Sequence, residues 1–169
     1  MHRRDDEYVP YVERVWPRLY RTAYALCGNQ HEAEDLLQSV LVKVYGSWSR
    51  VSQAENPDAY VRRMLVNEFT SWRRRGRARA EFSFAVPPDR GTAGHEHAVT
   101  DRVAMWQALA LLPPRRRAVV VLRYYEGLSE QQIAAALGIA PGTVKSQCSA
   151  ALKTLRGALG SSLTTEGTR

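Results

Sequence analysis

Small polar and basic side chains gather on one face of a short segment near the C-terminal end of the chain. At helical spacing they point away from an apolar face that holds Val144, Cys148 and Leu152. Hydroxyl, amide and ammonium groups of this kind form hydrogen bonds with base edges in the major groove of DNA. The polar face holds Thr143, Lys145, Ser146, Gln147, Ser149 and Ala150, with Lys153 following within reach of a phosphate. The segment is therefore a candidate DNA-reading surface.

The residues around this segment have the pattern of a helix-turn-helix, which we expect over residues 128–155. Ala134 is small where two helices must cross closely, and Gly138 can take the left-handed conformation of a sharp turn. Ser129 is a candidate N-cap, but Gln132 is its third following residue and we expect the reciprocal capping box to be incomplete. An ordinary helical hairpin without a ligand is the alternative, and the glycine turn and small residue favour DNA binding.

Arginines concentrate in two clusters, which fits the formal net charge of +7 and suggests a polyanionic partner such as nucleic acid. Among the residues of the first cluster there is one acid, Glu68. Four of its members would contact phosphates and position the protein without reading sequence, namely Arg73, Arg74, Arg75 and Arg77. A solvated basic helix end is the alternative. The first cluster consists of Arg62, Arg63, Arg73, Arg74, Arg75, Arg77 and Arg79.

The second cluster is Arg115, Arg116 and Arg117, at the start of an expected helix. Cations are poorly placed at a helix N-terminus because the helix dipole is positive there. We therefore expect these arginines to face an external anion, such as a DNA backbone.

The motifs of catalysis and metal binding are missing from the sequence. There is no phosphate-cradling glycine loop and no nucleophile elbow, and the His31-Glu32 pair lacks the second histidine of a zinc motif. Histidines 95 and 97 have no further ligands nearby. Cys27 and Cys148 are far apart, so that two buried thiols are preferred to a disulfide. We expect no enzymatic activity, no metal and no cofactor.

Helical periodicity dominates the chain, and no run of strand alternation is convincing. Helices are expected over about residues 6–27 and 31–48, with Pro17 kinking the first or starting a new helix. A further helix should begin at Asn56 as the cap and Pro57 as the first helical residue.

The helical periodicity of apolar residues stops in the middle of the chain. Residues 87–94 have neither periodicity nor apolar content, so we expect a flexible linker over residues 80–99. A second helical block follows over residues 100–160, with one helix from Arg115 to Glu126, and residues 161–169 form a disordered tail. The prediction is an all-α protein with two small helical domains, residues 1–79 and 100–160, joined by the flexible linker.

Membrane association is not expected from the sequence. No unbroken apolar stretch is longer than that of residues 118–122, which is far too short to cross a bilayer. The N-terminal residues lack the apolar core of a signal peptide, and we expect a cytoplasmic protein without membrane insertion.

Four segments carry a resemblance to a known family, and their order matters more than any one of them. They are AEDLLQ (33–38), PDAYVRRMLVN (57–67), WRRR (72–75) and the run from LPPRRR to RYYEGLS (112–129) that leads into the helix-turn-helix. With this order and the intervening linker, the chain resembles a bacterial RNA polymerase sigma factor of the extracytoplasmic-function (ECF) type in the sigma-70 family. It looks most like an actinobacterial branch.

The resemblance implies a division of labour between the domains. The N-terminal domain would bind the clamp helices of the largest polymerase subunit and read the −10 element. The C-terminal domain would read the −35 element and touch the polymerase flap. Family members do no covalent chemistry on DNA and are often inhibited by an anti-sigma protein.

The resemblance also assigns residues in the N-terminal domain. The core-polymerase contact falls on Asp35, Leu36 and Gln38, although Asp35 could simply balance the helix dipole. Asn67 matches an asparagine near an extruded −10 base, whose exposed edge an amide can read. Trp72 could stack on such a base, with core packing as the alternative. Phe69 is more strongly expected in the core.

In the C-terminal domain the resemblance assigns −35 contacts to Arg115, Arg116 and the polar face of the recognition helix. Many relatives carry arginines along this helix, and their scarcity here argues against a G-rich −35 element. A free-standing helix-turn-helix regulator is the alternative function. It would need a dimer interface, for which no heptad pattern is evident, and it would leave Asp35 and Asn67 without a role.

Overall fold

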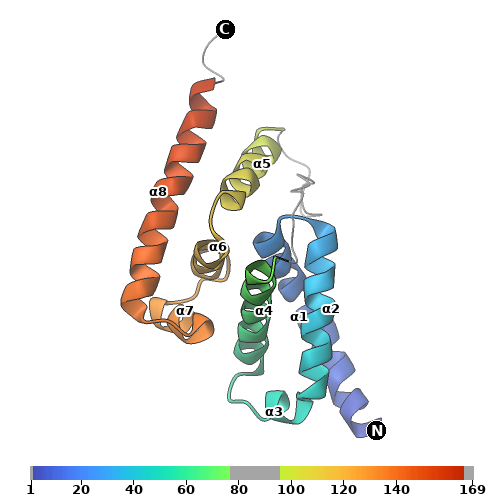
Figure 1. Ribbon diagram of the computed structural model, residues 1–169. Helices are drawn as coiled ribbons and strands as arrows, with labels where there is room; N and C mark the ends of the chain where they lie inside the picture. Colours follow the sequence, from blue (N-terminus) through green and yellow to red (C-terminus); the bar gives the residue numbers. More distant parts are fainter. Residues whose placement is uncertain (1, 77–95, 166–169) are drawn as a thin grey trace.

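The computed structural model describes residues 2–76 and 96–165, and every regular element within these ranges is helical (Figure 1). The prediction of an all-α fold is confirmed. In chain order the elements are α1 (His2–Cys27), α2 (Gln30–Gly46), α3 (Trp48–Ser52), α4 (Pro57–Arg74), α5 (Glu96–Ala110), α6 (Pro114–Val120), the π-helix η1 (Val121–Tyr125), α7 (Glu130–Leu137) and α8 (Pro141–Thr165).

The first helix passes through Pro10 and Pro17 without dividing, so Pro17 does not start a new helix. Proline removes one backbone donor, and burial of Val15 and Leu19 on either side favours a continuous helix. The helix ends at Cys27, and Gly28 follows with a φ of +81°, which suits a glycine.

Two asparagines start the next long helices. The side chain of Asn29 accepts a hydrogen bond from the Glu32 amide at 2.8 Å at the start of α2. Asn56 does the same for the Ala59 amide at 2.9 Å, and Pro57 is the first residue of α4, as predicted.

The C-terminal half differs from the sequence prediction at both ends. Helix α5 begins at Glu96, so the last residues of the predicted linker are helical. Helix α8 extends to Thr165, so residues 161–165 of the predicted tail are helical too. The rest of the predicted linker, residues 80–95, and of the tail, residues 166–169, lie outside the described residues.

The predicted helix-turn-helix is formed by α7 and α8. Gly138 has a φ of +66° at the turn between them. The expectation of an incomplete capping box is wrong, because the amide of Gln132 serves as well as a carboxylate. Ser129 Oγ accepts from the Gln132 amide at 3.1 Å, and Gln132 Oε1 accepts from the Ser129 amide at 2.9 Å.

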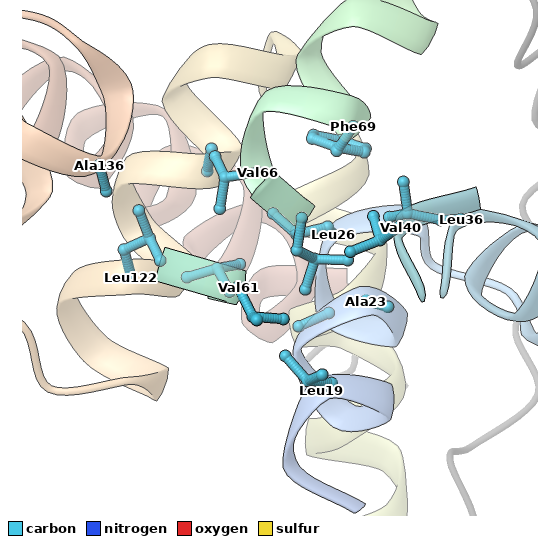
Figure 2. Close-up of a cluster of buried hydrophobic side chains, with 14 of the residues drawn as sticks. Leu19, Ala23, Leu26, Leu36, Val40, Val61, Val66, Phe69, Leu122 and Ala136 are labelled. Carbon is cyan, nitrogen blue, oxygen red and sulfur yellow. The ribbon is translucent and has the colours of Figure 1, made fainter. Parts of the chain in front are cut away.

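The two halves of the molecule pack directly on each other. In Figure 2, apolar side chains of α1, α2 and α4 meet Leu122 of η1 and Ala136 of α7 in one cluster. Helix α4 packs against both α6 and α7, and α1 packs against η1. A smaller cluster joins α5, α6 and α8. Two helical halves are present, as predicted, but in this structure they share a hydrophobic core.

Within residues 2–76 and 96–165, no helix combines the length and apolar character needed to cross a membrane.

Candidate nucleic-acid interface

The α4 surface exposes Asn67 between side chains that turn into the protein. Phe69 is 1% exposed and belongs to the core, so it is not available for stacking on a base. Trp72 packs partly against the same core, and its indole Nε1 donates to Glu68 Oε1 at 2.8 Å. Asn67 is therefore exposed on α4, and Trp72, five residues further on, is only partly exposed.

Glu68 organises this surface from below. Its buried carboxylate accepts hydrogen bonds from Ser39 Oγ at 2.8 Å, from Lys43 Nζ and from the Trp72 indole. Burial alone would raise the pKa of Glu68, but these three hydrogen bonds hold it below its ordinary value. A charged carboxylate thus fixes the orientation of Trp72.

The arginines at the end of α4 differ in availability. Arg74 and Arg75 are exposed, as a phosphate contact requires. The Arg73 side chain is only 10% exposed, and its Nη2 donates to Glu32 Oε2 at 2.8 Å and to the Cys27 carbonyl at 3.4 Å. Its predicted phosphate contact would require this ion pair to break. Arg77 lies outside the described residues.

A stripe along α2 carries the predicted polymerase contact. Asp35 and Gln38 are exposed one turn apart, but Leu36 is 0% exposed and packs in the core, so it cannot be a surface contact. Val42 continues the same face and is 73% exposed. Sequence reasoning missed Val42, and the available signal was an apolar residue seven positions after Asp35.

The recognition face of α8 is open to solvent. Thr143, Lys145 and Ser146 are exposed at its start, as are Ser149 and Lys153 further along. The predicted readers therefore lie along one side of the second helix of the helix-turn-helix.

Two arginines of α6 lie beside this face. Arg115 is exposed, and Arg116 Nε donates to Oε1 of the half-buried Gln147 at 3.1 Å. This hydrogen bond ties the start of α6 to the middle of the recognition surface, so Arg115, Arg116 and α8 could meet the same duplex.

Arg117 corrects the prediction that all three arginines face an external anion. It is 4% exposed, and its guanidinium donates to four carbonyls instead. Burial lowers the pKa of Arg117 to about 10, and the nearby charge of Arg73 acts in the same direction. The accepting carbonyls belong to Leu26 at 2.9 Å, Leu109 at 3.0 Å, Leu112 at 3.1 Å and Ala110 at 3.2 Å.

Glu126 forms a further polar site that sequence reasoning did not single out. Its side chain is 3% exposed, and its Oε2 lies 2.8 Å from Arg18 Nη2 and 3.2 Å from Arg62 Nε. Thr22 Oγ1 donates to the other oxygen. The partners are separated by at least 64 residues in sequence, so periodicity gives no sign of this pairing.

The two cysteines are free, and only Cys27 is buried. Burial raises the pKa of the Cys27 thiol to about 12. Cys148 is half-buried on α8 with its Sγ 3.7 Å from the Tyr124 hydroxyl, so the prediction of two buried thiols is half right. No group of three potential metal ligands is found among residues 2–76 and 96–165.

The fold and these surfaces define a class of protein. The C-terminal half contains a helix-turn-helix. The N-terminal half carries the exposed amide of Asn67, the ring of Trp72 and exposed arginines. Together they indicate a DNA-binding protein with two helical parts. Comparisons with known proteins identify the family. Residues 11–79 match the family model described as Sigma-70 region 2, and residues 102–155 match that described as Sigma-70, region 4.

Relatives along the whole chain agree with these matches. The RNA polymerase sigma-E factor of Streptomyces avermitilis is 38% identical over 150 residues, which cover 89% of this chain and 83% of the relative. The ECF RNA polymerase sigma factor SigL of Mycobacterium tuberculosis is 34% identical over 143 residues, or 82% of this chain and 80% of SigL.

A solved structure is similar in three dimensions. It is a co-crystal structure of the sigma factor RpoE with the anti-sigma factor NepR from Bartonella quintana. The matching chain is 30% identical with a TM-score of 0.72, over 89% of this chain and 95% of that one.

The chain therefore belongs to the extracytoplasmic-function sigma factors of bacterial RNA polymerase, and its relatives in Streptomyces and mycobacteria match the predicted actinobacterial branch. It binds the polymerase core and directs transcription from promoters with −10 and −35 elements. These findings support this function and not that of a free-standing helix-turn-helix regulator. Sigma factors are regulators of initiation rather than enzymes.

Proposed function

We propose that three separate surfaces divide the work of this sigma factor. The exposed face of α2 binds the polymerase core, α4 reads the −10 element, and α8 with the start of α6 reads the −35 element. Residues 1–79 and 100–160 are the corresponding functional domains, joined by residues 80–99. The observation that carries the proposal is that each surface exposes side chains able to meet a partner, namely Gln38 and Val42 on α2, Asn67 on α4, and Thr143 and Lys145 on α8.

The α2 face is suited to a protein partner. Asp35 and Gln38 offer hydrogen-bonding groups, and the 73% exposed Val42 adds an apolar contact in the same stripe. Interfaces combine apolar contacts at the centre with polar groups at the rim, and this stripe has both. The partner is the pair of clamp helices in the largest polymerase subunit.

The α4 surface is suited to single-stranded DNA. The exposed Asn67 amide can donate to and accept from one base edge. Trp72 is held by Glu68 at a position where its free edge can pack against a base. Arg74 and Arg75 follow on the same helix end and would contact phosphates, together with Arg73 and Arg77.

The α8 surface is suited to the major groove of duplex DNA. Thr143, Lys145, Ser146, Gln147 and Ser149 supply donors and acceptors for base edges. Arg115, Arg116 and Lys153 would contact the backbone beside them. The C-terminal half also touches the polymerase flap.

The proposed regulation and cellular location of this chain are those of its family. RpoE of Bartonella quintana is described in complex with an anti-sigma factor, and we propose that this chain also has an anti-sigma partner. The chain acts in the cytoplasm on RNA polymerase, has no catalytic activity of its own and needs no cofactor.

A pair of variants tests the separation between polymerase binding and −10 reading. Val42→Asp places a charge in the apolar part of the α2 face, and we expect about ten-fold weaker binding to core polymerase in a pull-down titration. Asn67→Ala should leave core binding within two-fold and change the preference among promoters in a base-substituted −10 library. Each variant is the control for the other. If Asn67→Ala leaves the library preference at the parent pattern, or Val42→Asp binds core normally, that surface is wrongly assigned.

A further inference from the structure

The amide of Gln147 on the recognition helix is held by an arginine from the neighbouring helix. Helix α6 packs against α8 (Figure 1), and Val120 of α6 shares a buried cluster with Ala151 of α8. Gln147 precedes Ala151 by one helical turn and is half-buried, so it lies where the packed face of α8 meets the open one. There Arg116 Nε donates to Gln147 Oε1 at 3.1 Å.

This hydrogen bond determines which end of the amide is left for DNA. A guanidinium nitrogen can only donate, so the atom that faces Arg116 must be the carbonyl oxygen of Gln147 and not its NH2 group. Among residues 2–76 and 96–165, Gln147 Nε2 has no acceptor within hydrogen-bonding distance, and it is not one of the buried side-chain atoms that lack a partner. Gln147 therefore offers two donors, and no acceptor, to a ligand of this face.

Arg116 keeps a second edge of its guanidinium for the DNA backbone. Within the described ranges, its two terminal nitrogens, Nη1 and Nη2, have no acceptor in the protein. A planar guanidinium can use these nitrogens for one phosphate while Nε still holds the Gln147 oxygen. A single arginine would then connect a backbone phosphate with the amide that reads a base.

The end of the amide that remains free decides which base it fits. A glutamine with both ends free reads adenine, because it accepts from N6 and donates to N7. In this protein the accepting end of Gln147 is occupied by Arg116. Two donors suit guanine, whose O6 and N7 are both acceptors in the major groove, whereas cytosine offers only the N4 donor there. The held amide thus favours one guanine on a helix that is otherwise poor in arginine.

We propose that Arg116 sets the base preference of Gln147, so that Gln147 binds one guanine of the −35 element as a pair of donors and does not read adenine. Arg116 is a positioning residue in this recognition, in addition to its contact with a phosphate. The inference rests on the proposed assignment of α8 to the −35 element. It adds the chemical class of base that this surface selects at one position.

The test measures binding of the complete holoenzyme to promoters that are substituted base by base in the −35 element. In the parent we expect one position where guanine is preferred to adenine by about ten-fold, and Gln147→Ala should abolish the preference at that position. The loss identifies the base that Gln147 contacts. Arg116→Ala should reduce the same preference below about three-fold or turn it toward adenine, because the amide can then use both of its ends.

Arg115→Ala is the matched control, because it removes the same charge from the exposed neighbour of Arg116 on α6. Both variants should lower the affinity and reduce the slope of log affinity against log salt by about 0.9, the value for one phosphate. Only Arg116→Ala should change the base preference. The preference is a ratio within one variant, so partial unfolding would weaken binding to all promoters without changing it.

Two further changes act on single atoms of the contact. Gln147→Glu keeps an acceptor for Arg116 but offers only acceptors to DNA, so the preference at the same position should move from guanine to cytosine, whose N4 donates. Replacement of the guanine by 7-deazaguanine removes the N7 acceptor. This replacement should weaken binding of the parent and leave binding of Gln147→Ala unchanged.

An unchanged base preference in Arg116→Ala would overturn the proposal, as would a parental preference for adenine at the position that depends on Gln147. Failure of the proposed function gives a different pattern. In that case Thr143→Ala and Lys145→Ala would also leave every −35 preference unchanged. If these two variants change −35 preferences and Gln147→Ala does not, α8 reads the element and only the role of Gln147 is wrong.

Discussion

At the scale of single residues, the acid in the first arginine cluster has a larger role than the sequence suggests. Glu68 lies among basic residues and is only 7% exposed. Its carboxylate accepts hydrogen bonds from the side chains of Ser39, Lys43 and Trp72. The proposed stacking residue Trp72 is therefore positioned by a charge beneath it. If Trp72 stacks on a base as proposed, Glu68 serves both stability and DNA reading.

Replacing this acid should alter the pH dependence of stability. The pKa of Glu68 is lower in the folded protein than its ordinary value of 4.5. Its stabilisation is therefore fully present above pH 4.5 and is lost as the pH falls through the lower folded value. Glu68→Gln should cost about 1–3 kcal/mol at pH 7, because three hydrogen bonds lose a charged and buried acceptor.

The measurement is urea unfolding at several pH values between 7 and 3. The difference in unfolding free energy between parent and Glu68→Gln should shrink below pH 4.5. Glu55→Gln, at an exposed position, is the control and should follow the parent throughout. A difference that stays constant down to pH 3 would mean that the carboxylate is not charged and bonded as described.

Among the elements, the end of η1 decides how Glu126 reaches Arg18 of α1 and Arg62 of α4. The π-helix η1 has the Glu126 amide bonded to the Val121 carbonyl at 3.0 Å, one residue further back than in an α-helix. Gly127, with a φ of +69°, then turns the chain toward α7. The wider turn of the π-helix directs the Glu126 side chain toward α1 and α4. Helix α7 then begins after its N-cap, Ser129.

The capping box of α7 should contribute measurably to stability. Ser129→Ala removes the acceptor of the Gln132 amide, which should cost about 1 kcal/mol and lower Tm by about 2–4 °C. Ser129→Asp keeps an acceptor and should retain most of the stability. Thermal unfolding followed by circular dichroism compares the two, with Ser49→Ala as an exposed control. Equal losses in the Ala and Asp variants would show that the cap does not act through this hydrogen bond.

Local sequence signals predicted the elements well because their causes are local. Asn56 and Gly138 act within a few residues of themselves, and each is found at the predicted helix boundary. The recognition face of α8 follows from helical spacing in the same way. The π-helix was not predicted, since no residue between 121 and 125 has a type that requires it.

For the whole molecule, the partner that each arginine side chain contacts could not be predicted from the sequence. Arg73, Arg116 and Arg117 belong to clusters that look alike in sequence, yet one pairs with Glu32, one with Gln147 and one with backbone carbonyls. These partners depend on how the two halves pack. A linker in the sequence predicts two domains but not whether they touch. The packing of the two halves on each other therefore had to come from the structure.

The exposed arginines at the end of α4 make a last prediction about the molecule on DNA. If Arg74 and Arg75 each neutralise a phosphate, the double variant to alanine should reduce the slope of log affinity against log salt by about 1.4–1.8. The affinity should fall on all promoters alike, because phosphate contacts carry no sequence information. Fluorescence anisotropy of labelled promoter DNA with the complete holoenzyme, from about 50 to 200 mM salt, measures both the slope and the affinity.

Arg50→Ala, which replaces an exposed arginine on α3, is the control for the loss of positive charge and should leave the slope unchanged. A loss confined to one promoter would instead indicate base contacts by these arginines, whereas an unchanged slope would mean that they remain solvated.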